Sequence, residues 1–315
     1  MTRVAAIDCG TNSIRLLVAD VQPEGLVEVT RRMEIVRLGE GVDRTGRLGT
    51  AALERTRAAL ADYALLVAGS GAGPVRMVAT SATRDAENAD EFRSMVHATL
   101  GVEPEVVTGQ EEARLSFDGA VRDLPAQMRE PFLVVDIGGG STEFVVGGRD
   151  GKIDAISVDI GCVRMTERHL RSDPPTAEQI KAASADISAA VDRAAAAVPA
   201  VDGGTLIGLA GSVTTVTALA LGLRAYQPNR IHHARTGRAA VAEVCSSLLA
   251  ATREQRLALP VMHPGRADVI GAGALILETI MDRFGMPDVV ASEHDILDGI
   301  AWSLVDPGAA RPDQA

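Results

Sequence analysis

Aromatic residues, lysine and cysteine are all scarce in this 315-residue chain. Phe, Tyr and Trp make up 3% of it, so the core must be built from Ala, Val, Ile and Leu. The chain also has few of the rings on which single-stranded nucleic acids stack. Acidic residues outnumber basic ones, and the formal charge of −11 argues against general binding of nucleic acids or anionic membranes. Neither GxxxxGKS nor GxxxxGKT occurs, which excludes a P-loop protein.

Cysteine usage and polarity indicate the compartment. Cys9, Cys162 and Cys245 form no CxxC pair, so we expect no disulfide framework and a reduced, cytoplasmic protein. The chain reaches Asp8 too soon to include the apolar region of a secretory signal. Residues 203–223 are uncharged, and ~20 apolar residues can cross a bilayer. Five of them are Gly and five are Ser or Thr, so we expect a buried strand, a glycine-rich turn and a helix, and no membrane partner.

A weak internal repeat organises the chain. VAAIDCGTNSIRLLVAD (4–20) and FLVVDIGGGSTEFVVGG (132–148) each contain an apolar strand, an Asp-x-Gly loop and a second apolar strand. Such a pattern predicts a β-hairpin at the head of each of two similar lobes. We place the lobes at 1–122 and 123–305, followed by a disordered tail at 306–315 that is polar and contains two prolines.

The remaining pattern alternates between strands and helices, which predicts an α/β fold. The expected strands are 4–9, 14–20, 26–37, 75–79, 104–107, 132–136, 142–147, 152–158, 205–209 and 287–291. The expected helices are 50–68, 88–99, 160–171, 176–198, 212–222, 237–250, 266–284 and 295–304. Asn88 or Asp90 is expected to cap the second helix, and Thr176 and Gln179 to form a capping box at the fourth.

Three glycine-containing turns are candidate phosphate sites, because glycine allows close backbone approach and successive N–H groups bind anions. The first follows Asp8, and the second has three consecutive glycines between Asp136 and Glu143. The third, 208–215, joins a strand to a helix, so its N–H groups lie at a positive helix end. The predicted phosphate-binding residues are Gly10, Thr11, Asn12, Ser13, Gly138, Gly139, Gly140, Ser141, Gly211 and Ser212.

Carboxylates flank the first two turns and would repel a bare phosphate. A hydrated divalent cation between them would remove that repulsion, and Mg²⁺ prefers oxygen ligands of this kind. We therefore predict a Mg²⁺ (or Mn²⁺) site at Asp8, Asp136 and Glu143. Plain hairpin turns without a ligand are the alternative interpretation.

Four further segments narrow the assignment. ATSATRDAENADEF (79–92), TGQEEARLSFDG (108–119), DIGGGSTEF (136–144) and RADVIGAGALIL (266–277) together resemble the exopolyphosphatase and guanosine pentaphosphate phosphohydrolase (Ppx/GppA) family. The resemblance covers roughly residues 4–303 and fits the short form without an extra helical domain. It implies two lobes of the actin-like and sugar-kinase-like (ribonuclease H-like) fold, with a cleft between them, and a homodimer.

The resemblance also assigns catalytic residues. Thr108 and Glu111 fit a capping box, which leaves Glu112 about 100° further round the helix and free to face the cleft. The family places the general base at this Glu before Ala-Arg, and places Arg84 in the phosphate site. We expect Asp136 and Glu143 to complete the catalytic set with Glu112 and Arg84.

The expected substrates are inorganic polyphosphate or guanosine pentaphosphate, which the sequence does not separate. An ATP-binding kinase and a non-catalytic polyphosphate or alarmone binder are alternatives. Further cationic candidates are Arg15, Arg164, Arg168 and Arg266. His232 and His233 have no partner at metal-ligand spacing in the sequence, and Leu297 stands where longer family members carry an arginine.

Overall fold

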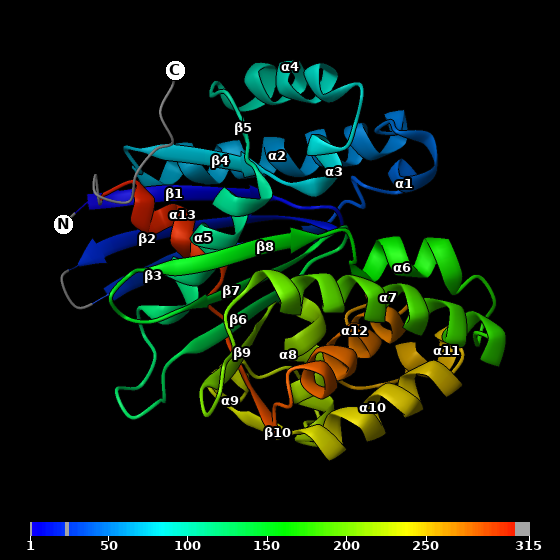
Figure 1. Ribbon diagram of the computed structural model, residues 1–315. Coiled ribbons are helices and arrows are strands. Elements are labelled where there is room, and N and C mark those ends of the chain that lie inside the picture. Colours follow the sequence, from blue (N-terminus) through cyan, green and yellow to red (C-terminus); the bar gives the residue numbers. More distant parts are fainter. Residues whose placement is uncertain (1, 23–24, 306–315) are drawn as a thin grey trace.

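The computed structural model describes residues 2–22 and 25–305, which form two lobes with one β-sheet each (Figure 1). The predicted tail at 306–315 lies outside the described residues. The first sheet has the order β3 (Gly25–Ile35), β2 (Ser13–Gln22), β1 (Thr2–Cys9), β4 (Val75–Ala79) and β5 (Glu105–Val106). The second has the order β8 (Ile153–Val158), β7 (Thr142–Gly147), β6 (Phe132–Ile137), β9 (Thr205–Leu209), β11 (Asp288–Ala291) and β10 (Arg235–Gly237).

The two sheets repeat one topology. In each, the first three strands of the lobe pair antiparallel, and the fourth pairs parallel with the first. The strand order from edge to edge in the first lobe is therefore third, second, first, fourth, fifth. The second lobe has the same order when β10 is left out of the count, with β11 as its fifth strand and β10 added at the edge beyond it. This confirms the predicted α/β fold of two similar lobes, each headed by a hairpin.

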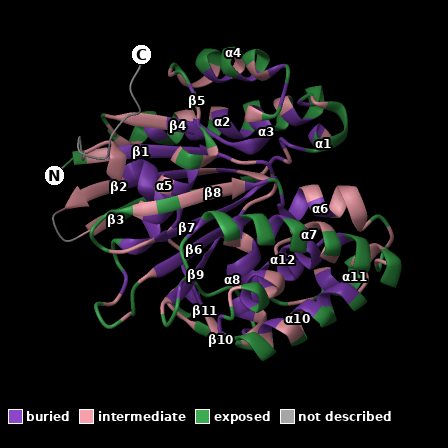
Figure 2. Ribbon diagram, in the orientation of Figure 1, coloured by how far each residue is buried: buried purple, intermediate pink, exposed green. Residues whose placement is uncertain are grey.

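Helices cover both faces of the sheets. The first half contains α1 (Val42–Thr45), α2 (Thr50–Ser70), α3 (Ser81–Arg84), α4 (Ala89–Leu100) and α5 (Gly109–Val121). The second half contains α6 (Cys162–His169), α7 (Ala177–Ala197), α8 (Ala210–Ala220), α9 (Pro228–Ile231), α10 (Arg238–Ala250), α11 (Arg253–Leu257), α12 (Ile270–Arg283) and α13 (Ile296–Ser303). Figure 2 shows buried residues along the central strands and exposed residues on the outer helices.

Strand β1 is apolar from Val4 to Ile7 because its alternate residues there face two different layers. Ala5 and Ile7 pack with α2 and α4, whereas Val4 and Ala6 pack with α5 and α13. β6 repeats the arrangement: Leu133, Val135 and Ile137 join the core under α7, α8 and α12, and its other apolar residues contact α5. Continuous hydrophobic runs are typical of strands buried on both faces.

Helices α5 and α13 lie side by side between the two sheets (Figure 1). A Cβ on Gly119 would come 1.9 Å from the Asp295 carbonyl oxygen, and one on Gly299 would come 2.0 Å from that of Leu115. Only glycine permits this approach. The last helix of the chain thus packs on the sheet of the first lobe, and α5, which carries Glu112, is held between both.

Most expected elements are present, and the differences are local. The expected segment 203–223 forms β9 and α8, and no helix among the described residues is long and apolar enough to span a membrane. Five short elements were not predicted, because segments of three to five residues are too short to show a hydrophobic period: α1, α3, α9, α11 and β10. The Thr176–Gln179 capping box is confirmed. Asn88 occupies the N-cap position of α4 as predicted, but its side chain bonds the backbone of Leu48 instead of capping the helix. The box predicted at Thr108 and Glu111 is half formed: the Thr108 hydroxyl accepts a hydrogen bond from the Glu111 amide, whereas the Glu111 carboxylate pairs with Arg76.

Candidate active site

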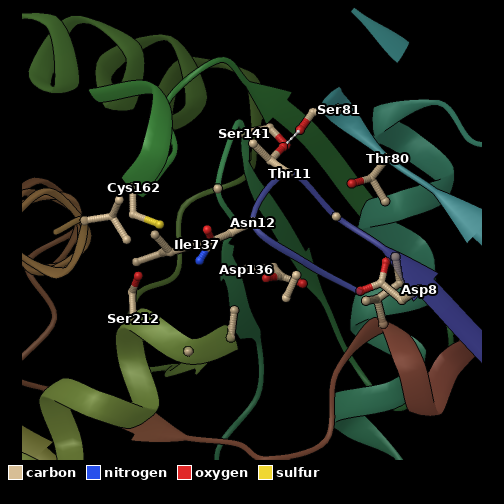
Figure 3. A pocket seen from close by; sticks show the side chains of 18 of the residues that line it. Asp8, Thr11, Asn12, Thr80, Ser81, Asp136, Ile137, Ser141, Cys162 and Ser212 are labelled. Carbon is tan, nitrogen blue, oxygen red and sulfur yellow. Dashed lines mark hydrogen bonds between the residues drawn. The ribbon is translucent and has the colours of Figure 1, made fainter. Parts of the chain in front are cut away.

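A cavity of about 90 Å³ lies between the lobes, where the two hairpin loops face each other (Figure 3). It gathers residues from β1, α5, β6 and α8 and from the segment that follows β4. The predicted site residues that line it are Asp8, Gly10, Thr11, Asn12, Ser13, Glu112, Asp136, Gly138, Gly139, Ser141, Gly211 and Ser212. Thr80 and Ser81, which follow β4, line it as well and were missed by the sequence analysis. These two residues could have been predicted from their position directly after a parallel strand, because ligands of open α/β sheets bind there.

The two hairpin loops have the same internal geometry. The Gly10 amide donates to the Ser13 carbonyl at 2.9 Å, and the Gly138 amide donates to the Ser141 carbonyl at 3.1 Å. Within the described part of the chain, four other loop amides, those of Thr11, Asn12, Gly139 and Gly140, donate no hydrogen bond to another backbone group. Unpaired N–H groups from both lobes can bind an anion.

The loops also touch each other, which explains two of the three consecutive glycines. A Cβ on Gly139 would lie 2.8 Å from Thr11 Cβ, and one on Gly140 would lie 2.5 Å from the Ser81 hydroxyl. The Thr11 and Ser81 hydroxyls are hydrogen-bonded at 2.9 Å (Figure 3). Any larger residue in the second loop would push the lobes apart. Gly140 faces a small space beside the main cavity, so its predicted direct phosphate contact is not supported.

Glu112 faces the cavity from the first turn of α5. The Thr108 hydroxyl accepts a hydrogen bond from the Glu111 amide and starts the helix. Burial raises the pKa of Glu112 to about 7, opposed by the Arg84 guanidinium and reinforced by nearby Asp136. A carboxylate with this pKa can exchange protons near neutral pH.

Arg84 does not line the cavity, contrary to its predicted place in the phosphate site. Its Nη1 donates to Glu112 Oε2 at 3.0 Å and to the Val107 carbonyl at 2.9 Å. The guanidinium therefore orients the Glu112 carboxylate from behind.

Asp8 is buried and only half satisfied. Its Oδ2 accepts hydrogen bonds from Arg15 at 2.6 and 2.9 Å, whereas its Oδ1 has no hydrogen-bond partner. Burial raises the pKa of Asp8, and the Arg15 guanidinium opposes this. Arg15 also bonds Asp295, so both of its carboxylate partners are inside the protein and it is not available to a phosphate.

Asp136 is the equivalent carboxylate of the second lobe. Its Oδ2 accepts a hydrogen bond from the Ser116 hydroxyl at 2.7 Å. Burial, followed by repulsion from Asp295, raises the pKa of Asp136 to about 6.

The predicted metal set fits only in part. The orphaned Asp8 Oδ1 and the carboxylate of Asp136 both face the cavity, and all donors are oxygens, as Mg²⁺ requires. Glu143 does not line the cavity: it is fully buried and accepts a hydrogen bond from Ser157 at 2.7 Å. The ligand atoms of the three carboxylates do not gather within 4.8 Å of one another in the described ranges. A cation would thus be held by Asp8 and Asp136 together with water, and Glu143 is corrected to a buried neighbour.

The third turn completes the cavity and supplies its cation. Gly211 and Ser212 begin α8, and Ala210 beside them adopts a left-handed backbone with φ of 65°. A Cβ on Gly211 would come 2.2 Å from the guanidinium carbon of Arg266, which lies flat against this glycine. No carboxylate among residues 2–22 and 25–305 comes within ion-pair distance of Arg266, whose guanidinium contacts the Thr215 hydroxyl and Met33 sulfur.

The other cationic candidates are already paired. Arg164 binds Asp43 and Asp85, and Arg168 binds Asp43 and Asp186, all at 2.5–2.8 Å. Neither arginine lines either cavity, whereas the candidates Arg15 and Arg266 line both.

A second cavity, of about 440 Å³, adjoins the first at Arg15, Gly211 and Arg266. Its walls combine basic side chains (Arg31 and Arg32), acidic ones (Glu293 and Asp295) and apolar or aromatic ones (Met33, Tyr226, Pro260, Met262 and Leu297). Leu297, in the first turn of α13, is buried in the core that this helix forms with the first sheet, so the side chain that replaces the family's arginine belongs both to the wall and to the core.

The histidines form a cluster that the sequence did not show. Asp123 Oδ2 lies 2.8 Å from His232 Nε2 and from His294 Nδ1, and Asp123 Oδ1 lies 3.8 Å from His233 Nε2. His232 thus has a partner 109 positions away, which spacing along the sequence could not reveal. The Glu293 amide donates to His232 Nδ1 at 3.1 Å, which leaves the proton of the neutral ring on Nε2, facing Asp123. The cluster is therefore a hydrogen-bonded network that joins the end of α5 to the start of α13.

Comparisons with known proteins agree with this geometry. The model of the Ppx/GppA phosphatase family matches residues 17–306. Exopolyphosphatase 2 of Mycobacterium tuberculosis is 51% identical over 318 residues, which cover 96% of this chain and 99% of that protein. The crystal structure of an exopolyphosphatase-like protein is 43% identical, with a TM-score of 0.93 over 96% of this chain and 97% of that one. A guanosine-5'-triphosphate,3'-diphosphate pyrophosphatase of Aeromonas hydrophila is 28% identical, over 96% of this chain and 59% of that protein. The chain therefore belongs to the Ppx/GppA phosphatase family.

Proposed function

We propose that this protein is an exopolyphosphatase, a phosphoric anhydride hydrolase that removes the terminal phosphate of inorganic polyphosphate. The observation that carries the proposal is the cavity itself. Among the described residues, the space that the buried Glu112 faces is bordered by amides of both hairpin loops that donate no backbone hydrogen bond and by Arg266, which forms no ion pair with a carboxylate. The similarity to Exopolyphosphatase 2 supports the choice of substrate.

In this proposal the terminal phosphoryl group lies between the two hairpin loops. The amides of Thr11, Asn12 and Gly139 and the Arg266 guanidinium stabilise charge on its oxygens, which supplies much of the catalysis in phosphoryl transfer. Glu112 accepts a proton from the attacking water as the water oxygen bonds to phosphorus and the bridging P–O bond breaks. Arg84 keeps the carboxylate aimed at that water. The products are orthophosphate and a chain shorter by one unit.

A divalent cation, Mg²⁺ or Mn²⁺, held by Asp8 and Asp136 with water, would neutralise phosphate charge when bound. Asp8 Oδ1, which lacks a partner, supports this part of the proposal. A homodimer and a cytoplasmic location also belong to the proposal. The three cysteines are free and buried, as expected for a protein without disulfides.

One observation favours guanosine pentaphosphate as a second candidate substrate. The adjoining cavity offers Tyr226, Met33 and Met262 beside Arg266, a combination that suits a nucleoside next to a phosphate. The relative from Aeromonas hydrophila named above supports this candidate.

The test is release of phosphate with Mg²⁺ from triphosphate, long polyphosphate, guanosine pentaphosphate and ATP in parallel. We expect release from polyphosphate, and loss of several orders of magnitude in Glu112→Gln with binding largely kept. Release from the guanosine compound alone would select the second candidate. Tight binding without turnover would indicate a non-catalytic binder, and release or transfer from ATP alone would indicate a kinase-like protein. Full activity of Glu112→Gln would reassign the base.

A further inference from the structure

The side of the cavity formed by the second loop is closed by a bridge between the lobes. Helix α6 of the second lobe faces α1 and α3 of the first, and three of its charged side chains reach across. The Gly41 amide donates to the Glu167 carboxylate at 3.1 Å, and Arg168 binds Asp43 at 2.8 Å. The third side chain, Arg164, does more than join the lobes.

Arg164 uses all three of its nitrogen atoms, each for a different partner. Its Nε donates to the Gly140 carbonyl of the second hairpin loop at 2.7 Å. Its Nη1 donates to Asp43 at 2.6 Å and its Nη2 to Asp85 at 2.5 Å, and both carboxylates belong to the first lobe. The planar guanidinium fixes the directions of these bonds, which lysine could not reproduce. The side chain is 12% exposed, so solvent weakens these charge-assisted bonds less than it would at the surface.

These contacts connect the loop to the catalytic carboxylate. Asp85 directly follows Arg84, which holds Glu112 at 3.0 Å. The chain from Glu112 through Arg84 and Asp85 to Arg164 therefore ends at Gly140, next to the amide of Gly139 that borders the cavity. A shift of the lobes would disturb both ends of this chain together.

We propose that Arg164 is a positioning residue that clamps the second phosphate loop to the first lobe, so that lobe closure and assembly of the phosphate site are one event. The inference rests on the proposed function, because the loop is assigned there to the terminal phosphate. Arg168 provides a matched control: it lies on the same helix and pairs with the same Asp43, but it does not touch the loop. The difference between the two arginines isolates the contact with Gly140 and Asp85.

The experiment compares Arg164→Gln, Asp85→Asn and Arg168→Gln in two measurements. The first is kcat and KM with inorganic triphosphate and Mg²⁺. The second is amide hydrogen exchange of the peptide covering residues 136–147, without substrate. We expect Arg164→Gln and Asp85→Asn to lower kcat/KM about 10- to 100-fold, because small misplacements of a phosphate site have effects of this size. Both should speed exchange in the loop, and Arg168→Gln should change kcat/KM by less than about fivefold.

The double variant tests that both residues act through one contact. If they do, Arg164→Gln combined with Asp85→Asn should lower kcat/KM little more than either alone. Asp85→Asn alters the other lobe, so it keeps the test valid if Arg164→Gln does not fold. Wild-type exchange in the loop of both single variants would overturn the proposal, and so would faster exchange with unchanged kcat/KM. A protein without phosphatase activity would refute the proposed function, whereas the exchange measurement would still decide whether Arg164 holds the loop.

Discussion

Burial gives Glu112 a pKa that suits a catalytic base, but it also makes the ionised carboxylate destabilising to the folded protein. Its pKa is raised in the folded protein to about 7 because it is buried, so the protonated form is the more stable one inside the cavity. The contribution of this residue to folding is therefore fullest below its unfolded pKa near 4.5, and it is lost as the pH rises through about 7. The ionised form that can act as a base is the form that destabilises the fold.

Removing this charge should stabilise the protein at high pH. We expect the free energy of unfolding of Glu112→Gln, relative to wild type, to increase by about 2–3 kcal/mol between pH 5 and pH 8. Urea unfolding at the two pH values measures this difference. In the wild type, kcat/KM should rise with pH up to about 7 as the same group ionises.

Glu54→Gln is the control for this substitution. Glu54 is exposed on α2 and its pKa is lowered by the Arg57 hydrogen bond, so that variant should gain no stability as the pH rises. An acid limb of kcat/KM near pH 4.5, or a pH-independent difference for Glu112→Gln, would contradict a buried base at this position.

Residue partners were harder to predict than residue positions. The family resemblance assigned Glu112 as the base, and its place one residue after Glu111 on the helix, which depends only on neighbours in the sequence, left it free to face the cavity. The pairing of Arg15 with Asp295 joins positions 280 apart, and that of Asp123 with His232 joins positions 109 apart. No local pattern reports such contacts, so the bonds from Arg84 to Glu112 and from Ser157 to Glu143 were not foreseen, and neither Arg84 nor Glu143 lines the cavity.

At the scale of elements, the crossing of α5 and α13 is the contact that depends most on glycine. We expect Gly299→Ala to destabilise the protein by about 3 kcal/mol, because its Cβ would collide with the backbone oxygen of Leu115 and the helices would have to separate. Thermal or urea unfolding measures the loss. Activity should fall as well, since α5 carries Glu112.

The matched change is Gly69→Ala in α2, where a Cβ would meet no atom within 4 Å. This variant should gain about 0.5–1 kcal/mol, as alanine is the better helix former. Equal stability of the two alanine variants would show that α5 and α13 are not in close contact in solution.

Helices and strands could be predicted where burial gives their sequence a regular hydrophobic pattern. β1, β6 and α7 follow their hydrophobic patterns closely, and the repeated Asp-x-Gly loops correctly indicated two similar hairpins. The return of α13 to the sheet of the first lobe was not predicted, because its apolar face would fit either lobe equally well. Short elements such as α3 are formed by tertiary contacts rather than by their own sequence.

At the scale of the whole molecule, local and overall charge oppose each other. The chain carries a formal charge of −11, while the second cavity presents Arg32 and Arg266 beside the first; its Arg31 is paired with Glu28 and Asp298, and Glu293 and Asp295 also line it. A polyphosphate should therefore gain affinity with each unit that enters the second cavity, and gain nothing from units that extend over the acidic surface.

We expect KM to fall with chain length at first and then to level off or rise in low salt. Added salt screens the repulsion over about 10 Å at 0.1 M, so it should improve the KM of long chains relative to short ones. A series of polyphosphates of defined length, assayed at two salt concentrations, measures both effects. A KM that keeps falling with length in low salt would mean that the chain follows a basic path outside the two cavities, and the acidic surface would then not limit binding.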